Sequence, residues 1–192
     1  EKDFWKAFEP HFFDEIESVV QGVDCSILIN NVGHLTGWIP YHEQPPDLIQ
    51  DTIACGTIVQ ARMTHILLPR FIARKHRHAS SIVFITAQCM HPSFGFAIAL
   101  PNEISIPYLA VYEASNSFGY YHACSIVKEY GHHPWLDVLN ITPGAVLTEN
   151  TSQVLKTTPF AVDASIFVGN ILRFMGGNVN GTTRPSTTSD AA

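Results

Sequence analysis

The chain has 192 residues, of which 46% are hydrophobic and 15% charged, and its formal net charge is −6. This length and composition indicate one globular domain with a single core. The acidic balance argues against nucleic acid as a partner, because binding phosphates requires a concentrated basic surface. No run approaches the roughly 20 apolar residues of a membrane span, so we expect a soluble chain.

The cysteines lie far apart in the sequence and include no Cys-x-x-Cys pair. They indicate neither a zinc knuckle nor a disulfide framework. We expect small buried hydrophobic side chains in a reducing compartment. The four positions are Cys25, Cys55, Cys89 and Cys124.

The first elements predict a helix followed by a buried strand. Apolar residues recur at helical spacing over Phe4–Val20, with an interruption expected at Pro10. Cys25–Ile29 is a short continuous apolar run, typical of a parallel strand buried on both faces. Asn30–Gly33 then lies at the carboxyl end of that strand, where ligands sit in open α/β sheets. A loop over His34–Pro46 follows.

A long helix is expected next, over about Asp47–Ala73, with a core side that contains several isoleucines. Its basic end, Arg70–His78, is either an anion or membrane-surface patch or a solvated helix terminus whose cations suit the helix dipole. Ser80–Thr86 has the β-branched and aromatic composition of a second strand. The candidate core positions are Ile49, Ile53, Ile58, Ile66 and Leu67.

The second half continues the alternation of helices and strands. An apolar, proline-punctuated loop spans Cys89–Pro107, and the helix that contains Tyr112 continues to about Tyr130. This alternation predicts βαβ units, and therefore an α/β fold with a parallel sheet. The remaining expected elements are a strand at Leu136–Ile141, a turn at Pro143–Thr148, a helix at Ala161–Met175 and a weak strand near Val179.

Four motifs occur in the order in which short-chain dehydrogenases/reductases show them, and together they resemble that family. ILINNVG (Ile27–Gly33) is similar to the Asn-Asn-Ala-Gly segment, and SIVFITA (Ser81–Ala87) to the strand before the catalytic serine. YEASN (Tyr112–Asn116) resembles the active-site helix, and PGAVLT (Pro143–Thr148) the stretch that holds nicotinamide. Each motif is weak alone, whereas the ordered set is fairly specific.

Three further features resemble the very-long-chain 3-oxoacyl-CoA reductase and 17β-hydroxysteroid dehydrogenase branch. They are the valine at position 32, the Met-Thr-x-x-Leu-Leu-Pro phrase at Met63–Pro69, and the Val-Asn-Gly ending at Val179–Gly181. The resemblance implies a Rossmann-type fold with helices on both sheet faces, NADP(H) as cofactor, reduction of an acyl-CoA or steroid ketone in lipid metabolism, and an endoplasmic-reticulum setting.

The resemblance also implies a catalytic tetrad, of which one member is present. Tyr112 is the expected proton donor, but Asn116 stands where the family has lysine. Ala87 occupies the serine position, beside the hydroxyl of Thr86, and Gly56 occupies the asparagine position. A lysine that lowers a tyrosine pKa by about three units contributes roughly 4 kcal/mol, which a neutral asparagine cannot supply.

The same comparison implies a set of cofactor contacts. Asp3 resembles the adenine-contacting aspartate, although the glycine-rich turn that grips pyrophosphate does not precede it in this sequence. Asn30 and Asn31 either approach the cofactor or satisfy turn hydrogen bonds. The implied cofactor-binding residues are Asp3, Asn30, Val32, Gly33, Pro143, Gly144 and Thr148.

The absence of that turn implies that the family's first strands are missing. The strand at Ser26–Asn30 should then present an exposed apolar edge and make a free monomer aggregation-prone. We expect a fragment, an incomplete chain or a decayed relative, with a partial Rossmann-type domain over 1–181 and a disordered tail over 182–192. The Cys89–Pro107 insertion either shapes an acyl pocket or reflects loop drift, and a homodimer would use the two long helices.

Two functions remain open from the sequence. One is an NADP(H)-linked reductase of 3-oxoacyl-CoA or steroid ketones, and the other is a catalytically inactive relative that acts as a binding or interaction protein. A metal hydrolase has little support, because the paired histidines lack the i, i+4 ligand spacing. A serine hydrolase lacks its Gly-x-Ser-x-Gly motif.

Overall fold

A computed structural model describes residues 3–35, 37–76, 78–87, 107–149, 151 and 161–175. The chain divides into two compact units, Glu1–Gly144 and Ala145–Ala192. Several predictions lie outside the described residues: the insertion over 88–106, the weak strand near Val179, the domain end at 181 and the tail over 182–192.

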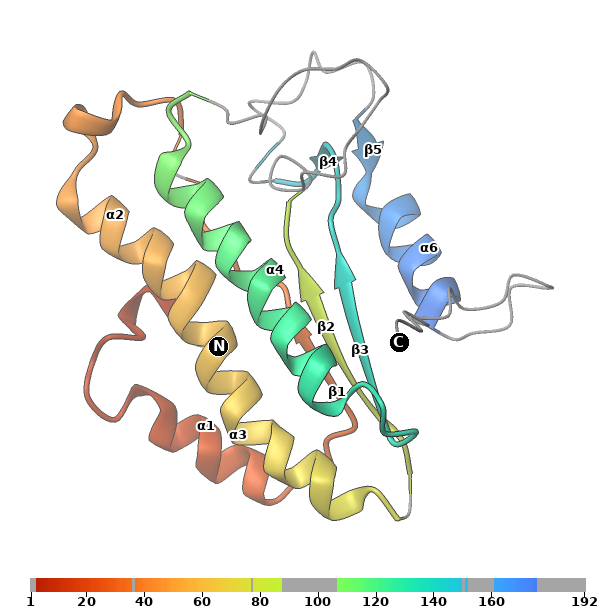
Figure 1. The fold of residues 1–192 in the computed structure, drawn as a ribbon. Coiled ribbons are helices and arrows are strands. Elements are labelled where there is room, and N and C mark those ends of the chain that lie inside the picture. Colours follow the sequence, from red (N-terminus) through yellow and green to blue (C-terminus); the bar gives the residue numbers. More distant parts are fainter. Residues whose placement is uncertain are drawn as a thin grey trace, which may run out of the picture. The chain divides into compact units, whose positions relative to one another are not determined.

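The first unit is built on a parallel sheet of three strands in the order β1-β2-β3. They are β1 (Ile27–Asn30), β2 (Ser80–Ile85) and β3 (Leu136–Ile141). The connecting helices α1 (Phe12–Gln21), α3 (Val59–Arg74) and α4 (Ala110–Tyr130) lie on one side of these strands (Figure 1). The structure therefore confirms the predicted Rossmann-type α/β architecture, in which parallel strands are joined by helical crossovers.

The first helix begins later than its apolar spacing suggested. A short 3-10 helix, η1 (Phe4–Lys6), precedes a break at Pro10, and His11 takes a left-handed φ of 65° before α1 begins. The predicted interruption at Pro10 is confirmed, because a proline ring restricts the chain at this point. Phe12 and Phe13 are buried and pack with Ala54 and Val59 from the long helix.

The predicted long helix is one continuous helical segment with an unexpected turn inside it. α2 (Pro46–Ile53) passes through a π-helical turn, η3 (Ala54–Ile58), into α3. Of the five predicted core positions, Leu67 is buried and Ile58 and Ile66 are partly buried against the cluster of Phe12 and Phe13, whereas Phe71 and Ala54 are fully buried. A π turn changes the number of residues per turn, so a helix face extrapolated at regular spacing across it is displaced.

The main core lies between the sheet and the helices. Leu28, Ile82 and Phe84 point to the same side of the sheet, because residues two apart on a strand share a face and the strands pair in register. They pack against Leu67 and Phe71 of α3. On α4, Ala123 and Ile126 complete this cluster.

The outer edge of β1 is apolar and exposed. The Ile27 and Ile29 side chains are 53% and 51% exposed, and among the described residues β1 pairs only with β2. Because Ser81 N–H donates to Ser26 C=O, alternation directs the backbone groups of Ile27 and Ile29 to the unpaired side. Among the described residues β1 is therefore the predicted edge strand, but the prediction that it is buried on both faces is wrong, because Ile27 and Ile29 expose one face.

The second unit contains a two-stranded parallel sheet and one helix. Its strands are β4 (Val146–Leu147) and β5 (Val162–Asp163), and its helix is α6 (Ala164–Met175). The helix begins three residues after the predicted start at Ala161, because Asp163 accepts a hydrogen bond from Ser165 N–H at 2.8 Å and caps it. The Ser165 hydroxyl, which donates to the same oxygen, and then the Ser165 N–H bond lower the pKa of Asp163. No helix within the described ranges is long and apolar enough to cross a bilayer.

The β1 edge generates a prediction about self-association. The double substitution Ile27→Lys and Ile29→Lys should reduce aggregation with little loss of stability, because both side chains are half exposed and edge lysines oppose strand pairing. Light scattering against protein concentration measures the effect. Leu28→Lys is the control and should unfold the chain, because Leu28 is 7% exposed. Unchanged scattering from the folded double variant would show that association uses another surface.

Candidate functional site

The predicted site residues of the first unit gather at one end of the sheet. The three strands run in the same direction in Figure 1, and their carboxyl ends point towards the upper part of the picture, where α4 begins. In parallel α/β sheets ligands bind at this end. The residues that follow the strands or begin the helix there are Asn30, Val32, Gly33, Ala87, Pro143, Gly144 and Tyr112.

Asn116 bonds to the backbone of its own helix. Its Nδ2 donates a hydrogen bond to the Tyr112 carbonyl oxygen at 2.9 Å, four residues earlier. Both side chains are half buried. A bond of this kind satisfies the amide locally and supplies no positive charge. The role of Tyr112 as proton donor stays a prediction, and its neighbour does not replace the family's lysine.

Gly56 is required by close packing of two helices. A Cβ atom on Gly56 would lie 2.5 Å from Ser115 Cβ, closer than any real contact between carbon atoms. Residue 56 sits in the η3 turn and residue 115 in α4. The position that resembles the family's asparagine is therefore filled by a helix contact, and a side chain there would push α4 away.

The hydroxyl of Thr86 is used to join two strand ends. Its Oγ1 lies 3.3 Å from both Asn140 Oδ1 and the Ile141 carbonyl oxygen, which it can donate to, and the residue is 6% exposed. The alternative that Thr86 presents its hydroxyl in place of Ala87 finds no support in this geometry. Ala87, half buried, offers a methyl group.

Gln60 is a residue of this region that sequence reasoning missed. A Cβ on Gly119 would lie 2.9 Å from Gln60 Oε1 and 3.0 Å from Thr86 Cγ2, so Gln60 fills the space beside Gly119. Its Nε2 also donates to the Gly56 carbonyl oxygen. The available signal was its spacing, one helical turn after Gly56.

The predicted cofactor contacts differ in their availability. Asn30 is 8% exposed and its Nδ2 donates to Thr64 Oγ1 at 3.2 Å, which is the structural rather than the cofactor-facing role. Val32 and Gly33 are exposed after β1, as is Gly144 after β3. In the second unit, Thr148 forms hydrogen bonds with Thr151 across a local turn. None of these residues is thereby tested as a cofactor contact.

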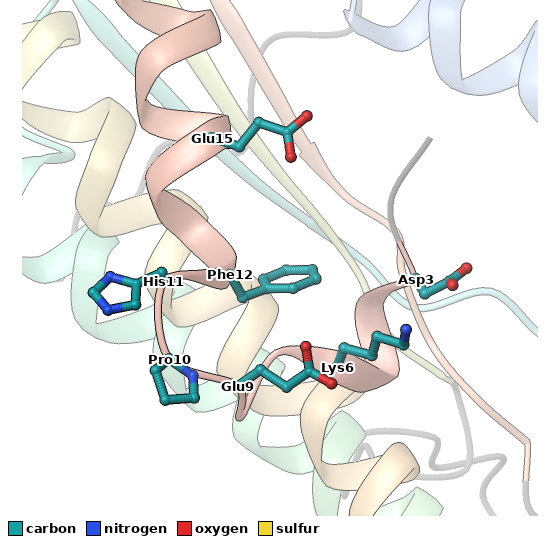
Figure 2. Close-up of a pocket in the computed structure, with 7 residues that line it drawn as sticks. All are labelled: Asp3, Lys6, Glu9, Pro10, His11, Phe12 and Glu15. Atoms are coloured by element: carbon teal, nitrogen blue, oxygen red, sulfur yellow. The ribbon is translucent and has the colours of Figure 1, made fainter.

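Asp3 lies in a separate concavity of about 410 Å³ between η1 and α1. Figure 2 shows its lining side chains, which come from η1, the turn after it and the start of α1. Three carboxylates, Asp3, Glu9 and Glu15, face this space with Lys6 as the only lysine or arginine in its lining. This charge balance does not favour a phosphate. A second cavity, of about 100 Å³, lies between β1 and the long helix and is too small for a nucleotide.

Cys55 is the buried cysteine among those that the structure describes. Cys25 and Cys124 are half buried, so the prediction of buried cysteines holds for Cys55 alone, and Cys89 lies outside the described residues. Burial, followed by the charge of Asp51, raises the pKa of Cys55 to about 11. Its thiol is therefore protonated at neutral pH and a poor nucleophile.

The parallel sheet, its helical crossovers and its ligand-side carboxyl ends define a Rossmann-type α/β protein. No family model matches the sequence. The fold is similar to a short-chain dehydrogenase from Sphingobium yanoikuyae in complex with NADPH, with a TM-score of 0.69 and 20% identity over 88% of this chain and 61% of that one. A short-chain dehydrogenase from Burkholderia cenocepacia in complex with NADP gives a TM-score of 0.68 and 17% identity over 93% of this chain and 65% of that one.

Sequence comparison agrees with this likeness. The chain is 25% identical to a very-long-chain 3-oxoacyl-CoA reductase of Aspergillus clavatus, over 86% of this chain and 44% of that protein. It is 27% identical to human 17-beta-hydroxysteroid dehydrogenase type 3, over 88% of this chain and 50% of that protein. The chain spans about half the length of these curated relatives. It is a relative of the short-chain dehydrogenase/reductase family.

The Gly56 contact predicts a coupled stability effect. Gly56→Ala should lower the free energy of unfolding by about 1–2 kcal/mol, because overpacking costs about 1–3 kcal/mol and the gain in helix propensity returns only about 1 kcal/mol. Adding Ser115→Gly removes the opposing Cβ, so the double variant should be more stable than the sum of the single effects. Urea titration followed by circular dichroism measures this.

A matched control exists for the Gly56 substitution. Gly169 lies within α6 and a Cβ there meets nothing within 4 Å, so Gly169→Ala should not destabilise the chain. If the two substitutions, at residues 56 and 115, changed the free energy of unfolding by strictly additive amounts, that result would contradict the contact.

Cys55 should react slowly with iodoacetamide. At pH 8 a thiol with a pKa of about 11 is ionised to roughly one part in a thousand, and burial further limits access. Peptide mass spectrometry over time should show Cys25 and Cys124 modified first. Equal labelling rates at all three positions would show that the long helix opens around Cys55.

Proposed function

We propose that this chain is a ketone reductase of the short-chain dehydrogenase/reductase type that acts on apolar ketones, either 3-oxoacyl-CoA or steroid substrates. The observation that carries the proposal is that Tyr112 lies in the first turn of α4, a helix that packs against β2 and β3. The names of the curated relatives support the two substrate classes. NADP(H) is the proposed cofactor, in line with the ligands of the two structural neighbours.

The chain's own part in this reaction is proton transfer. The bound dinucleotide would supply hydride to the carbonyl carbon. The Tyr112 hydroxyl then gives its proton to the carbonyl oxygen, which becomes the alcohol, and the resulting phenolate takes a proton back from water. Developing charge on that oxygen needs nearby donors or cations. Asn116 and Ala87 supply none that the geometry directs there, so we propose a slow reductase.

The described residues suit only one end of such a cofactor. Exposed backbone at Val32, Gly33 and Gly144 can face the nicotinamide half at the strand ends. Within the described ranges, no glycine-rich turn opens a helix towards a pyrophosphate, the feature that gives dinucleotide folds their anion grip. Weak binding of NADP(H) by this chain is the expectation.

The second candidate is an inactive relative that serves as a binding or interaction protein. It is favoured by the bond from Asn116 to its own helix and by the Gly56 contact with Ser115, because both use tetrad positions for structure. A homodimer through the two long helices and an endoplasmic-reticulum setting remain proposals that rest on the family resemblance.

Turnover separates the two candidates. The purified chain should oxidise NADPH with 3-oxopalmitoyl-CoA or androstenedione, and Tyr112→Phe should abolish this loss of absorbance at 340 nm. Tyr121→Phe, at a 65% exposed tyrosine of the same helix, is the matched control and should retain the rate. Turnover unchanged in Tyr112→Phe would overturn the assignment of the proton donor.

Restoring the missing ammonium group gives a second test. Asn116→Lys should raise the rate by tenfold or more, because a lysine at this position would add a cation one helical turn from Tyr112. Asn116→Met, of similar length and neutral, controls for the loss of the amide. If neither variant shows turnover and fluorescence detects no NADPH binding, the inactive relative is better supported than the reductase.

A further inference from the structure

The outer side of β1 offers backbone groups for a further strand. Ser81 N–H donates to Ser26 C=O at 2.9 Å, so the even-numbered residues of β1 face β2 and the odd-numbered Ile27 and Ile29 face away. Among the described residues β1 pairs with β2 alone. Each outward residue therefore presents one N–H donor and one C=O acceptor along this edge.

The side chains along this edge are branched and uncharged. Ile27 and Ile29 are half exposed, and Val23 and Val32, which flank the strand, are 54% and 38% exposed. The sequence from Cys25 to Gly33 contains no charged residue. Edge strands that stay unpaired in native proteins are commonly protected by lysine or another charge, and β1 has no such protection.

The groups just before β1 are already engaged within the chain. Asp24 forms an ion pair with Arg74 at 3.2 Å, so the carboxylate nearest the strand is neutralised. Cys25 N–H donates to the Val23 carbonyl oxygen, and the Cys25 carbonyl oxygen accepts from Arg74. Pairing with a further strand therefore cannot begin at Cys25, and within β1 it involves Ile27 and Ile29.

The other described edge of this sheet is less suited to pairing. β3 contains Asp137, which is exposed, and a charge on an edge strand opposes its pairing with an identical strand. β1 is therefore the edge at which two copies of this chain can meet without bringing like charges together.

We propose that β1 pairs with β1 of a second copy of this chain, antiparallel and about a two-fold axis at Leu28. In this register Ile27 lies opposite Ile29 of the partner subunit, and the two residues exchange both backbone hydrogen bonds. The same pair recurs on the other side of the axis, because a two-fold interface presents each contact twice. The two sheets then form one continuous sheet, and the interface closes at two chains.

A second copy fits this edge because the strand is complementary to itself. The outward residues are two positions apart, so a reversal of the strand about Leu28 places donors opposite acceptors at both positions. The isoleucines of the two copies form cross-strand pairs of β-branched side chains on the face away from the core. An unrelated peptide would gain the same backbone bonds but would have to bring its own apolar side chains in this spacing.

Charge substitutions test the register. In the Ile27→Lys, Ile29→Glu variant each introduced lysine would lie opposite an introduced glutamate of the partner subunit. Lysine at both positions, or glutamate at both, places like charges opposite each other, which opposes pairing. The mixed variant should therefore dimerise at least tenfold more tightly than either like-charge variant. Sedimentation equilibrium measures the dissociation constants, and circular dichroism checks that each variant is folded.

Tyr121→Lys is the matched control. Tyr121 is 65% exposed on α4, one of the two long helices, and its substitution should leave the dissociation constant of the dimer unchanged. Loss of the dimer in this control, with the dimer kept in both like-charge variants, would overturn the proposal in favour of an interface through the long helices. A wild-type chain that stays monomeric, or equal association by all three charge variants, would also overturn it.

Amide hydrogen exchange, followed by NMR on the wild-type chain, reports the backbone pairing itself. Exchange at Ile27 and Ile29 should slow as the chain concentration rises through the dissociation constant, because their N–H groups become bonded only in the dimer. Exchange at Leu28, whose backbone faces β2, should not depend on concentration. Dimerisation without added protection at Ile27 and Ile29 would show that the second copy binds elsewhere.

Discussion

The close approach of the π turn of the long helix to α4 determines much of the rest of the first unit. Gly56 and Ser115 touch so tightly that no side chain fits at residue 56, and one turn along α4 Gly119 leaves space for Gln60 against Thr86. These contacts fix how closely α4 approaches the long helix and the end of β2. The same packing removes the place where a fourth catalytic side chain would stand.

Polar groups at the ligand end of the sheet are largely committed to the fold. Asn30 bonds to Thr64, Thr86 bonds to the end of β3, and Asn116 bonds to the helix backbone. Buried polar groups must find partners, because an unpaired one costs about 1–3 kcal/mol. Each bond strengthens the architecture and withdraws a donor or acceptor from a ligand. Several polar groups at this end of the sheet are therefore used by the fold itself.

Sequence reasoning predicted the strands and the order of the helices because these depend on local composition. Ser80–Ile85 and Leu136–Ile141 are rich in β-branched and apolar residues, and their bounds were nearly those of the observed strands. The π turn was not predictable, because it coincides with a tertiary contact of Gly56 with Ser115, which no local pattern reveals. The two-residue strands β4 and β5 are too short to give a period.

The candidate site was predictable only in part, because some of its contacts join residues that are far apart in the sequence. The ordered motifs placed Tyr112 and its altered neighbours, because residue identity is explicit in the sequence. Gln44 bonds to Tyr108 and Gln60 packs against Gly119, partners far along the chain that no local pattern connects. Long-range hydrogen bonds of single glutamines leave no periodic signal.

The central claim is that Asn116, at the position where the family has a lysine, limits proton transfer from Tyr112 to a ketone. Chemical rescue tests this most directly: an Asn116→Gly chain with NADPH and androstenedione is assayed at 340 nm in methylammonium chloride and in tetramethylammonium chloride. The account predicts acceleration by methylammonium, which can donate a hydrogen bond from the vacated space, and none by tetramethylammonium. Equal rates in the two salts would contradict it.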